Sequence, residues 1–85
     1  MPVDVLDRAR EVVAALGGRE NVRRVEHCAE TRVRIEVIDD RRVDDRALAA
    51  ATPGGIMRVS STIWHLVIGT GAALHARAMQ GVREG

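Results

Sequence analysis

The sequence predicts an α+β domain: an open four-stranded antiparallel sheet with three helices packed on one face, in the order αββαββα. Segments whose apolar residues repeat at helical spacing alternate with pairs of short strand-like segments. The links within each strand pair are tight, which favours antiparallel hairpins. The clearest strand has one charged face, so the helices are expected to lie together against the other face.

The chain has 85 residues, of which 46% are hydrophobic and 29% charged. This length and balance are typical of one small globular domain spanning residues 1–85. Because there is no Phe or Tyr and only one Trp, the core must consist mainly of Val, Leu, Ile, Ala and Met.

The first segment, residues 4–16, has a helical stripe of apolar side chains. Asp4 is a plausible N-cap, and Asp7 in the first turn is favoured by the helix dipole. Gly17 and Gly18 provide the C-terminal stop.

Two strands are expected next, Asn21–Cys28 and Thr31–Ile38. In the second, apolar and charged residues alternate with the period of a half-buried strand. Cys28, Ala29 and Glu30 are then expected in the turn between the strands.

A charged loop, residues 39–42, precedes a short helix predicted at Val43–Ala51, with Asp44 or Asp45 near its N-cap. Residues 52–55, Thr-Pro-Gly-Gly, end that helix. The strands Ile56–Val59 and Ile63–Ile68 follow, joined at residues 60–62, and Trp64 is expected in the core. Residues 69–71, Gly-Thr-Gly, open the last helix.

Composition excludes several classes of protein. The formal charge is only +1, and all 13 basic residues are Arg, so the surplus of basic charge expected of a dedicated nucleic-acid binder is absent. The single cysteine forms no internal disulfide and excludes multi-cysteine zinc or iron–sulfur sites. Without a signal-like or membrane-spanning run, we expect a soluble cytoplasmic protein.

Cys28 is the leading candidate for chemistry. The thiolate is the reactive form of cysteine, and nearby guanidinium groups favour it. Since Arg also holds phosphate oxygens bidentately, a thiol beside Arg32 and Arg34 suits phosphoryl transfer. The alternative is a buried cysteine that acts as a small hydrophobe.

The neighbours of Cys28 also have two interpretations. Arg32 and Arg34 either bind phosphate or form a solvated face, paired across strands with acidic residues such as Glu26. Thr31 either donates a hydroxyl hydrogen bond to phosphate or is an ordinary strand residue. His27 either tunes the thiol or lies on the surface.

Other candidates have simpler interpretations. His65 and His75 have no metal-ligand spacing with His27, so both are interpreted as structural. Gly69 and Gly71 precede a helix and could offer amides to an anion, but a strand-to-helix turn explains them.

Several motifs together resemble one family. They are Ala15–Val22 (Ala-Leu-Gly-Gly-Arg-Glu-Asn-Val), His27-Cys28, Thr31–Arg34 (Thr-Arg-Val-Arg), Val43-Asp44, Gly54–Met57 and Val67–Gly69. From about Val5 to Val82, the chain resembles the enzyme IIB domain of the bacterial phosphoenolpyruvate-dependent sugar phosphotransferase system, in the glucose, N-acetylglucosamine, sucrose and β-glucoside superfamily. The core of the domain is then about residues 4–82.

The resemblance implies a sugar phosphotransferase of the protein-phosphocysteine type. Cys28 corresponds to the cysteine that accepts a phosphoryl group from a phosphohistidine of the IIA domain and passes it to a sugar held by the membrane IIC domain. Thr31, Arg32 and Arg34 correspond to the run that supports transfer. No metal or organic cofactor is implied, and the domain would lie in the cytoplasm, in contact with the membrane only through IIC.

One feature departs from the family pattern, which has a single residue between the cysteine and the Thr-Arg pair. Here Ala29 and Glu30 both intervene, so the loop is one residue longer and has an extra carboxylate. This favours the alternative that the chain is a regulatory or binding module of the same fold with a degenerate phosphorylation loop. The sugar is not indicated by the sequence.

Overall fold

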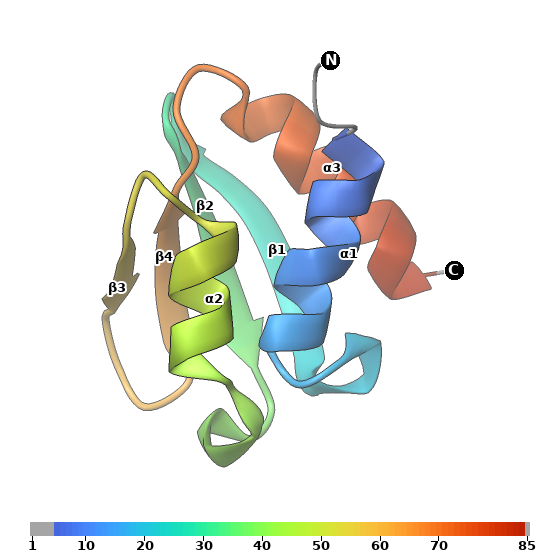
Figure 1. Cartoon of the computed structure of the whole chain (residues 1–85), viewed down its shortest axis with the longest axis vertical. Helices are drawn as coiled ribbons and strands as arrows, with labels where there is room; N and C mark the ends of the chain where they lie inside the picture. The colour runs from blue at the N-terminus through green and yellow to red at the C-terminus, as the bar shows by residue number, and fades with distance from the viewer. Residues whose placement is uncertain (1–4, 85) are drawn as a thin grey trace.

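The computed structural model describes residues 5–84 and confirms the predicted α+β architecture (Figure 1). Two short 3-10 helices, η1 and η2, accompany the predicted elements. In chain order the elements are α1 (Val5–Ala15), η1 (Arg19–Asn21), β1 (Val22–Ala29), β2 (Arg32–Val37), η2 (Asp40–Arg42), α2 (Asp45–Ala51), β3 (Ile56–Arg58), β4 (Ile63–Val67) and α3 (Ala72–Glu84).

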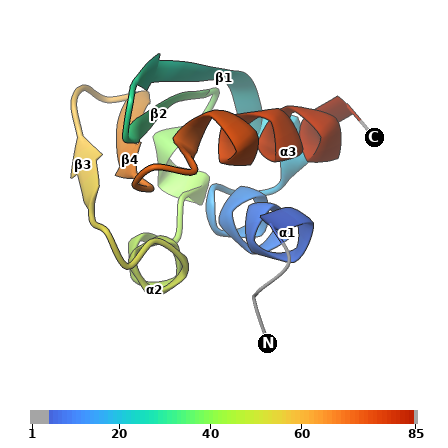
Figure 2. The ribbon, with the colours of Figure 1, turned by 90° about the horizontal axis from the view of Figure 1, so that it is seen from above.

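The strands form one antiparallel sheet in the order β1-β2-β4-β3. Figure 2 shows α1, α2 and α3 together on one side of this sheet. The predicted alternation in β2 is confirmed, since Val33, Ile35 and Val37 are buried. Their neighbours Arg34 and Glu36 point to the opposite, helix-free face and are half-buried.

The core lies between the helices and this sheet face and has the predicted aliphatic composition. Trp64 is only 4% exposed, which confirms its expected place in the core. The buried apolar residues are Ala9, Val12, Val13, Ala15, Leu16, Val22, Val25, Val33, Ile35, Val37, Leu48, Trp64, Leu66, Ala72, Ala76 and Met79.

Glycine ends α1 as predicted. Gly17 adopts a φ of 105°, a conformation that other residues rarely take. The Gly18 amide donates to Val13 O at 3.0 Å and the Gly17 amide donates to Ala14 O at 3.1 Å. This pair of bonds is a Schellman motif, which satisfies carbonyls at the end of the helix.

Asp44 is the N-cap of α2, because its carboxylate accepts a hydrogen bond from Ala47 N at 3.0 Å. This selects Asp44 from the two residues predicted near that cap. The N-cap predicted at Asp4 lies outside the described residues.

Two local predictions were wrong. Asn21 does not begin the first strand but ends η1, and it is fully buried. Its side chain forms hydrogen bonds with backbone atoms of Leu16 and Asp39, which lie in two different loops. The charged segment 39–42 is not wholly irregular, since Asp40–Arg42 form η2 under an Asp39 cap.

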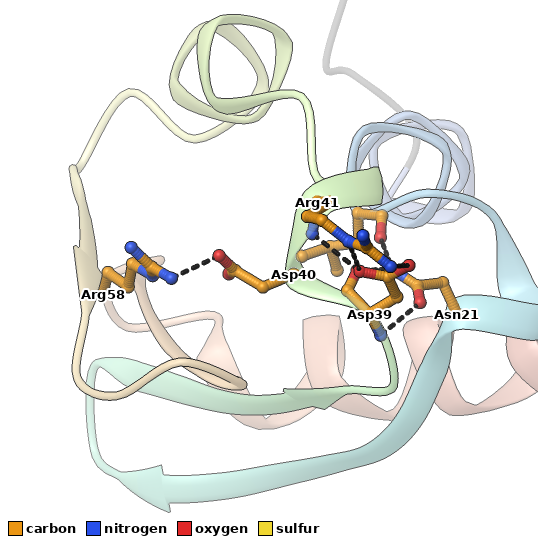
Figure 3. Close-up of polar contacts among 6 residues, drawn as sticks. Asn21, Asp39, Asp40, Arg41 and Arg58 are labelled. Atoms are coloured by element: carbon orange, nitrogen blue, oxygen red, sulfur yellow. Dashed lines mark hydrogen bonds and ion pairs between the residues drawn. The ribbon is translucent and has the colours of Figure 1, made fainter.

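Figure 3 shows the polar contacts that the acidic residues of this segment make with Asn21, Arg41 and Arg58. Asp40 forms an ion pair with Arg58 of β3 and accepts a hydrogen bond from the indole of Trp64 at 3.1 Å. Asp39 accepts hydrogen bonds from the side chain and backbone of Arg41, which lower the pKa of its carboxyl group. The two Asp40 contacts fix η2 against β3 and β4.

Candidate active site

Cys28 lies within β1, in agreement with the predicted strand Asn21–Cys28, but the strand continues through Ala29, so neither Cys28 nor Ala29 lies in the turn where both were also expected. His27 pairs with Val33 and Ala29 pairs with Arg32, so Cys28 is an extra residue in the ladder. Such a β-bulge is common on edge strands and beside active sites. The bulge explains why the strand continues past the cysteine.

The Cys28 side chain is exposed, so it is not the buried small hydrophobe of the alternative interpretation. Its Sγ is positioned to donate a weak hydrogen bond to the backbone oxygen of Arg32, at 3.9 Å. The thiol is therefore held against the start of β2 while it remains open to solvent.

Glu30 and Thr31 form the two-residue turn between β1 and β2, and both are exposed. The Thr31 carbonyl accepts two hydrogen bonds, from Ile68 N at 2.9 Å and Gly69 N at 3.0 Å. These bonds anchor the turn to the segment that leads into α3.

Arg32 and Arg34 both belong to the helix-free face of β2. Arg32 is exposed and lies opposite Ala29 on one side and Val67 on the other. Arg34 is half-buried and forms an ion pair with Glu26, with Nη1 3.4 Å from Oε1. The cross-strand pairing with Glu26 that the sequence suggested is thus confirmed for Arg34.

Sequence reasoning did not identify two parts of this region. Arg24 also pairs with Glu26, Nη1 to Oε1, at 3.4 Å, which its spacing of two residues along β1 would have suggested. The amides of Ile68 and Gly69 had no signal in the sequence, because their contact with Thr31 depends on the sheet order.

The histidines occupy different environments. His27 is exposed beside Cys28, and His65 lies opposite Arg34 in β4. His75 of α3 is 3% exposed, remote in sequence from the thiol, and its burial lowers its pKa, with a further contribution from Arg8. Among residues 5–84, no three His, Cys, Asp or Glu side chains are arranged to hold a metal ion.

This arrangement suits chemistry at a surface. A nucleophilic thiol at the end of an edge strand is accessible to a second macromolecule, and guanidinium groups on the next strand can bind an anion formed there. Within residues 5–84, no helix is long and apolar enough to cross a membrane.

Comparisons with known proteins identify the family. Residues 10–44 match the family described as "phosphotransferase system, EIIB". The chain is 42% identical over 65 residues to the N-acetylglucosamine-specific EIIB component of the phosphotransferase system of Streptomyces coelicolor, and the match covers 76% of this chain and 82% of the relative.

A solved structure supports the fold. One domain of the IIabc component of the phosphotransferase system from Clostridium difficile superposes with a TM-score of 0.74 and 23% identity, covering 91% of this chain and 79% of the other. The sequence relationship to the Streptomyces component shows more than the fold, because it extends over most of both chains. The chain therefore belongs to the EIIB family of the phosphotransferase system.

Proposed function

We propose that the chain is a phosphocarrier in which Cys28 receives a phosphoryl group from a IIA phosphohistidine and passes it to a sugar held by a membrane IIC component. The observation that carries the proposal is the exposed Cys28 at the β1 bulge, with Arg32 and Arg34 on the adjacent strand, in a chain of the EIIB family.

In the first step, the Cys28 thiolate attacks the phosphorus atom of the phosphohistidine. The S–P bond forms as the P–N bond breaks, and the imidazole nitrogen of the donor keeps the electron pair. Arg32 and Arg34 stabilise the charge on the phosphoryl oxygens. Thr31 and nearby loop amides are the proposed neutral donors.

In the second step, a sugar hydroxyl attacks the same phosphorus and gives up its proton to a base beside the sugar or to solvent. The O–P bond forms as the S–P bond breaks, and the leaving thiolate regenerates Cys28. Neither step requires a metal ion or an organic cofactor. Because the thiol has to meet two partners in turn, each interface is expected to be small and transient.

The partners and place of action follow from these steps. The domain would act in the cytoplasm and contact the inner face of the membrane through IIC. Since the Streptomyces relative is named as specific for N-acetylglucosamine, N-acetylglucosamine is the first sugar to test.

The alternative function is a regulatory or binding module with a degenerate phosphorylation loop. The exposed Glu30, which adds a negative charge two residues from Cys28, is the feature that favours it. The two functions differ in one outcome, namely whether Cys28 takes up phosphate.

Intact mass measurement tests this directly. The protein is incubated with phosphoenolpyruvate, the general phosphotransfer proteins and a IIA domain from the same cell. The expected result is the gain of one phosphoryl group, lost in the Cys28→Ser variant. A wild-type chain that stays unmodified while IIA becomes phosphorylated would overturn the phosphocarrier proposal in favour of the alternative.

A further inference from the structure

Arg24, Glu26 and Arg34 form a network of two ion pairs on the helix-free face of the sheet, near Cys28 in sequence. Glu26 Oε1 lies 3.4 Å from the guanidinium of Arg24 and 3.4 Å from that of Arg34. Glu26 and Arg34 are direct cross-strand partners, so the contact follows from the register of the sheet. Glu26 therefore shares one carboxylate oxygen between two cations.

The separation between this ion-pair network and Cys28 is comparable to the length of an Arg side chain. Glu26 precedes Cys28 by two residues, which corresponds to at most about 6–7 Å along β1, because the bulge at Cys28 shortens the regular strand rise. An Arg side chain spans a comparable length, so a modest change of torsion angles can move the Arg34 guanidinium from Glu26 towards Cys28. The Arg34 side chain is 35% exposed, so it faces solvent on the side where this change takes place.

We propose that Glu26 is a positioning residue: its carboxylate holds the Arg34 guanidinium away from the thiol until a phosphoryl group on Cys28 Sγ replaces the carboxylate as the partner of Arg34. This inference rests on the proposed phosphoryl acceptance by Cys28 and assigns Glu26 a function in it. Arg24 then retains Glu26, so the carboxylate keeps a counterion when Arg34 leaves.

The strength of the contact is suited to such an exchange. Exposed ion pairs contribute little to stability, and an oxygen–nitrogen separation of 3.4 Å is longer than a short charge-assisted hydrogen bond. A phosphoryl group offers Arg34 more charge and several acceptor oxygens, and guanidinium groups bind it bidentately. The exchange is therefore favourable without any rearrangement of the backbone.

Alkylation of Cys28 by two reagents measures whether Arg34 is available to an anion at the thiol. In both reactions the thiolate attacks the methylene carbon and iodide leaves, but iodoacetate is an anion and iodoacetamide is neutral. The ratio of the two rates cancels the intrinsic reactivity of the thiol. We expect Glu26→Gln to raise this ratio, because Arg34 is released towards Cys28 and a negative charge is removed.

A double-mutant cycle separates these two contributions. In an Arg34→Ala background, Glu26→Gln removes the charge but has no Arg34 to release. The increase in the ratio is therefore expected to be about two- to fivefold larger with Arg34 present, the range for one exposed ion pair. Equal increases in the two backgrounds would overturn the proposal.

Glu36→Gln is the matched control. It makes the same change of charge on the same sheet face, and within residues 5–84 Glu36 forms no ion pair with Arg34. Its effect on the ratio should be the same with Arg34 or Ala at position 34. If Glu36 is coupled to Arg34 as strongly as Glu26 is, the effect comes from the overall charge of the sheet face. That result would contradict a specific role for Glu26.

Phosphorylation provides the second measurement. With IIA as the donor, Glu26→Gln should raise the equilibrium ratio of phosphorylated to free Cys28 by about two- to fivefold, and this gain should shrink in the Arg34→Ala background. If alkylation shows the coupling and Cys28 takes up no phosphate, the proposed function fails while the Glu26–Arg34 relationship stands. If phosphate is taken up without coupling in either assay, the positioning role fails alone.

Discussion

Asn21 and Asp39 exchange two hydrogen bonds between loops that lie 18 residues apart in the chain. Asn21 Nδ2 donates to Asp39 O at 2.9 Å, and Asp39 N donates to Asn21 Oδ1 at 2.8 Å. Asn21 Nδ2 also donates to Leu16 O at 2.7 Å. A single buried amide thus joins the end of α1, the start of β1 and the segment after β2, as Figure 3 shows in part.

Replacing this amide should strongly destabilise the fold. Asn21→Ala removes all three side-chain hydrogen bonds and leaves backbone groups of Leu16 and Asp39 without these partners. We expect the free energy of unfolding to fall by about 2–4 kcal/mol. Urea denaturation measures this free energy. The control is Arg19→Ala, an exposed substitution, whose free energy of unfolding is expected within about 0.5 kcal/mol of the wild type. Equal stability of the two variants would show that the Asn21 contacts contribute little.

Much of the fold was predictable because the apolar pattern and the residues that begin or end helices indicate the same elements. Residues Val33, Ile35 and Val37 identified β2 and its buried face, and Gly17 with Gly18 marked the end of α1. Asp44 was correctly expected near the cap of α2. These are local signals, in which a few neighbouring residues determine the conformation.

The site was less predictable because it depends on register. The bulge at Cys28 arises from the pairing of β1 with β2, and no residue type in the segment marks it. Likewise, the contact between the Thr31 carbonyl and the amides of Ile68 and Gly69 exists only because β4 lies beside β2. Sequence reasoning selected the side chains of Cys28 and Arg34, whereas the backbone arrangement had to come from the structure.

The stability of the protein should depend on the protonation of His75. Burial, together with Arg8, lowers the pKa of His75 in the folded state, so the unfolded chain binds its proton more readily. Stability from this group is therefore complete above the unfolded pKa of about 6.5 and declines as the pH falls below it.

Urea denaturation at pH 7.5 and pH 5.5 measures this dependence. We expect the wild type to lose more stability than His75→Leu between these two values, because Leu has no proton to bind. Parallel losses in the two proteins would show that other groups cause the pH dependence.

Gly54 is required by the close approach of another strand. A Cβ atom at this position would lie 2.1 Å from Val67 O, a backbone atom that cannot rotate away. Gly54→Ala should therefore shift the 52–55 turn and destabilise the protein by about 1–3 kcal/mol.

Gly81→Ala is the matched control for this prediction. A Cβ at Gly81, within α3, meets no atom within 4 Å, and Ala is the better helix former by about 0.5–1 kcal/mol. The melting temperature, measured by thermal denaturation, should therefore fall for Gly54→Ala and rise for Gly81→Ala. A Gly54→Ala protein as stable as the wild type would contradict the close approach.

Glu30 should slow phosphoryl uptake through its charge. It is exposed in the turn two residues after Cys28, and a carboxylate there opposes the arrival of a phosphoryl group. Because the turn is exposed and solvent weakens the repulsion, we expect Glu30→Gln to raise the initial rate of transfer from IIA by only a few fold. Quenched-flow sampling with intact mass detection measures this rate.

Ionic strength distinguishes this charge effect from a change in the shape of the turn. The rate advantage of Glu30→Gln should decrease as salt is raised, since the Debye length falls from about 10 Å at 0.1 M to about 3 Å at 1 M. Glu11→Gln, an exposed change of the same charge on α1, should leave the rate close to that of the wild type. If Glu30→Gln is instead slower than the wild type at every salt concentration, the carboxylate assists transfer, and the longer loop is an adaptation of this chain and not a defect.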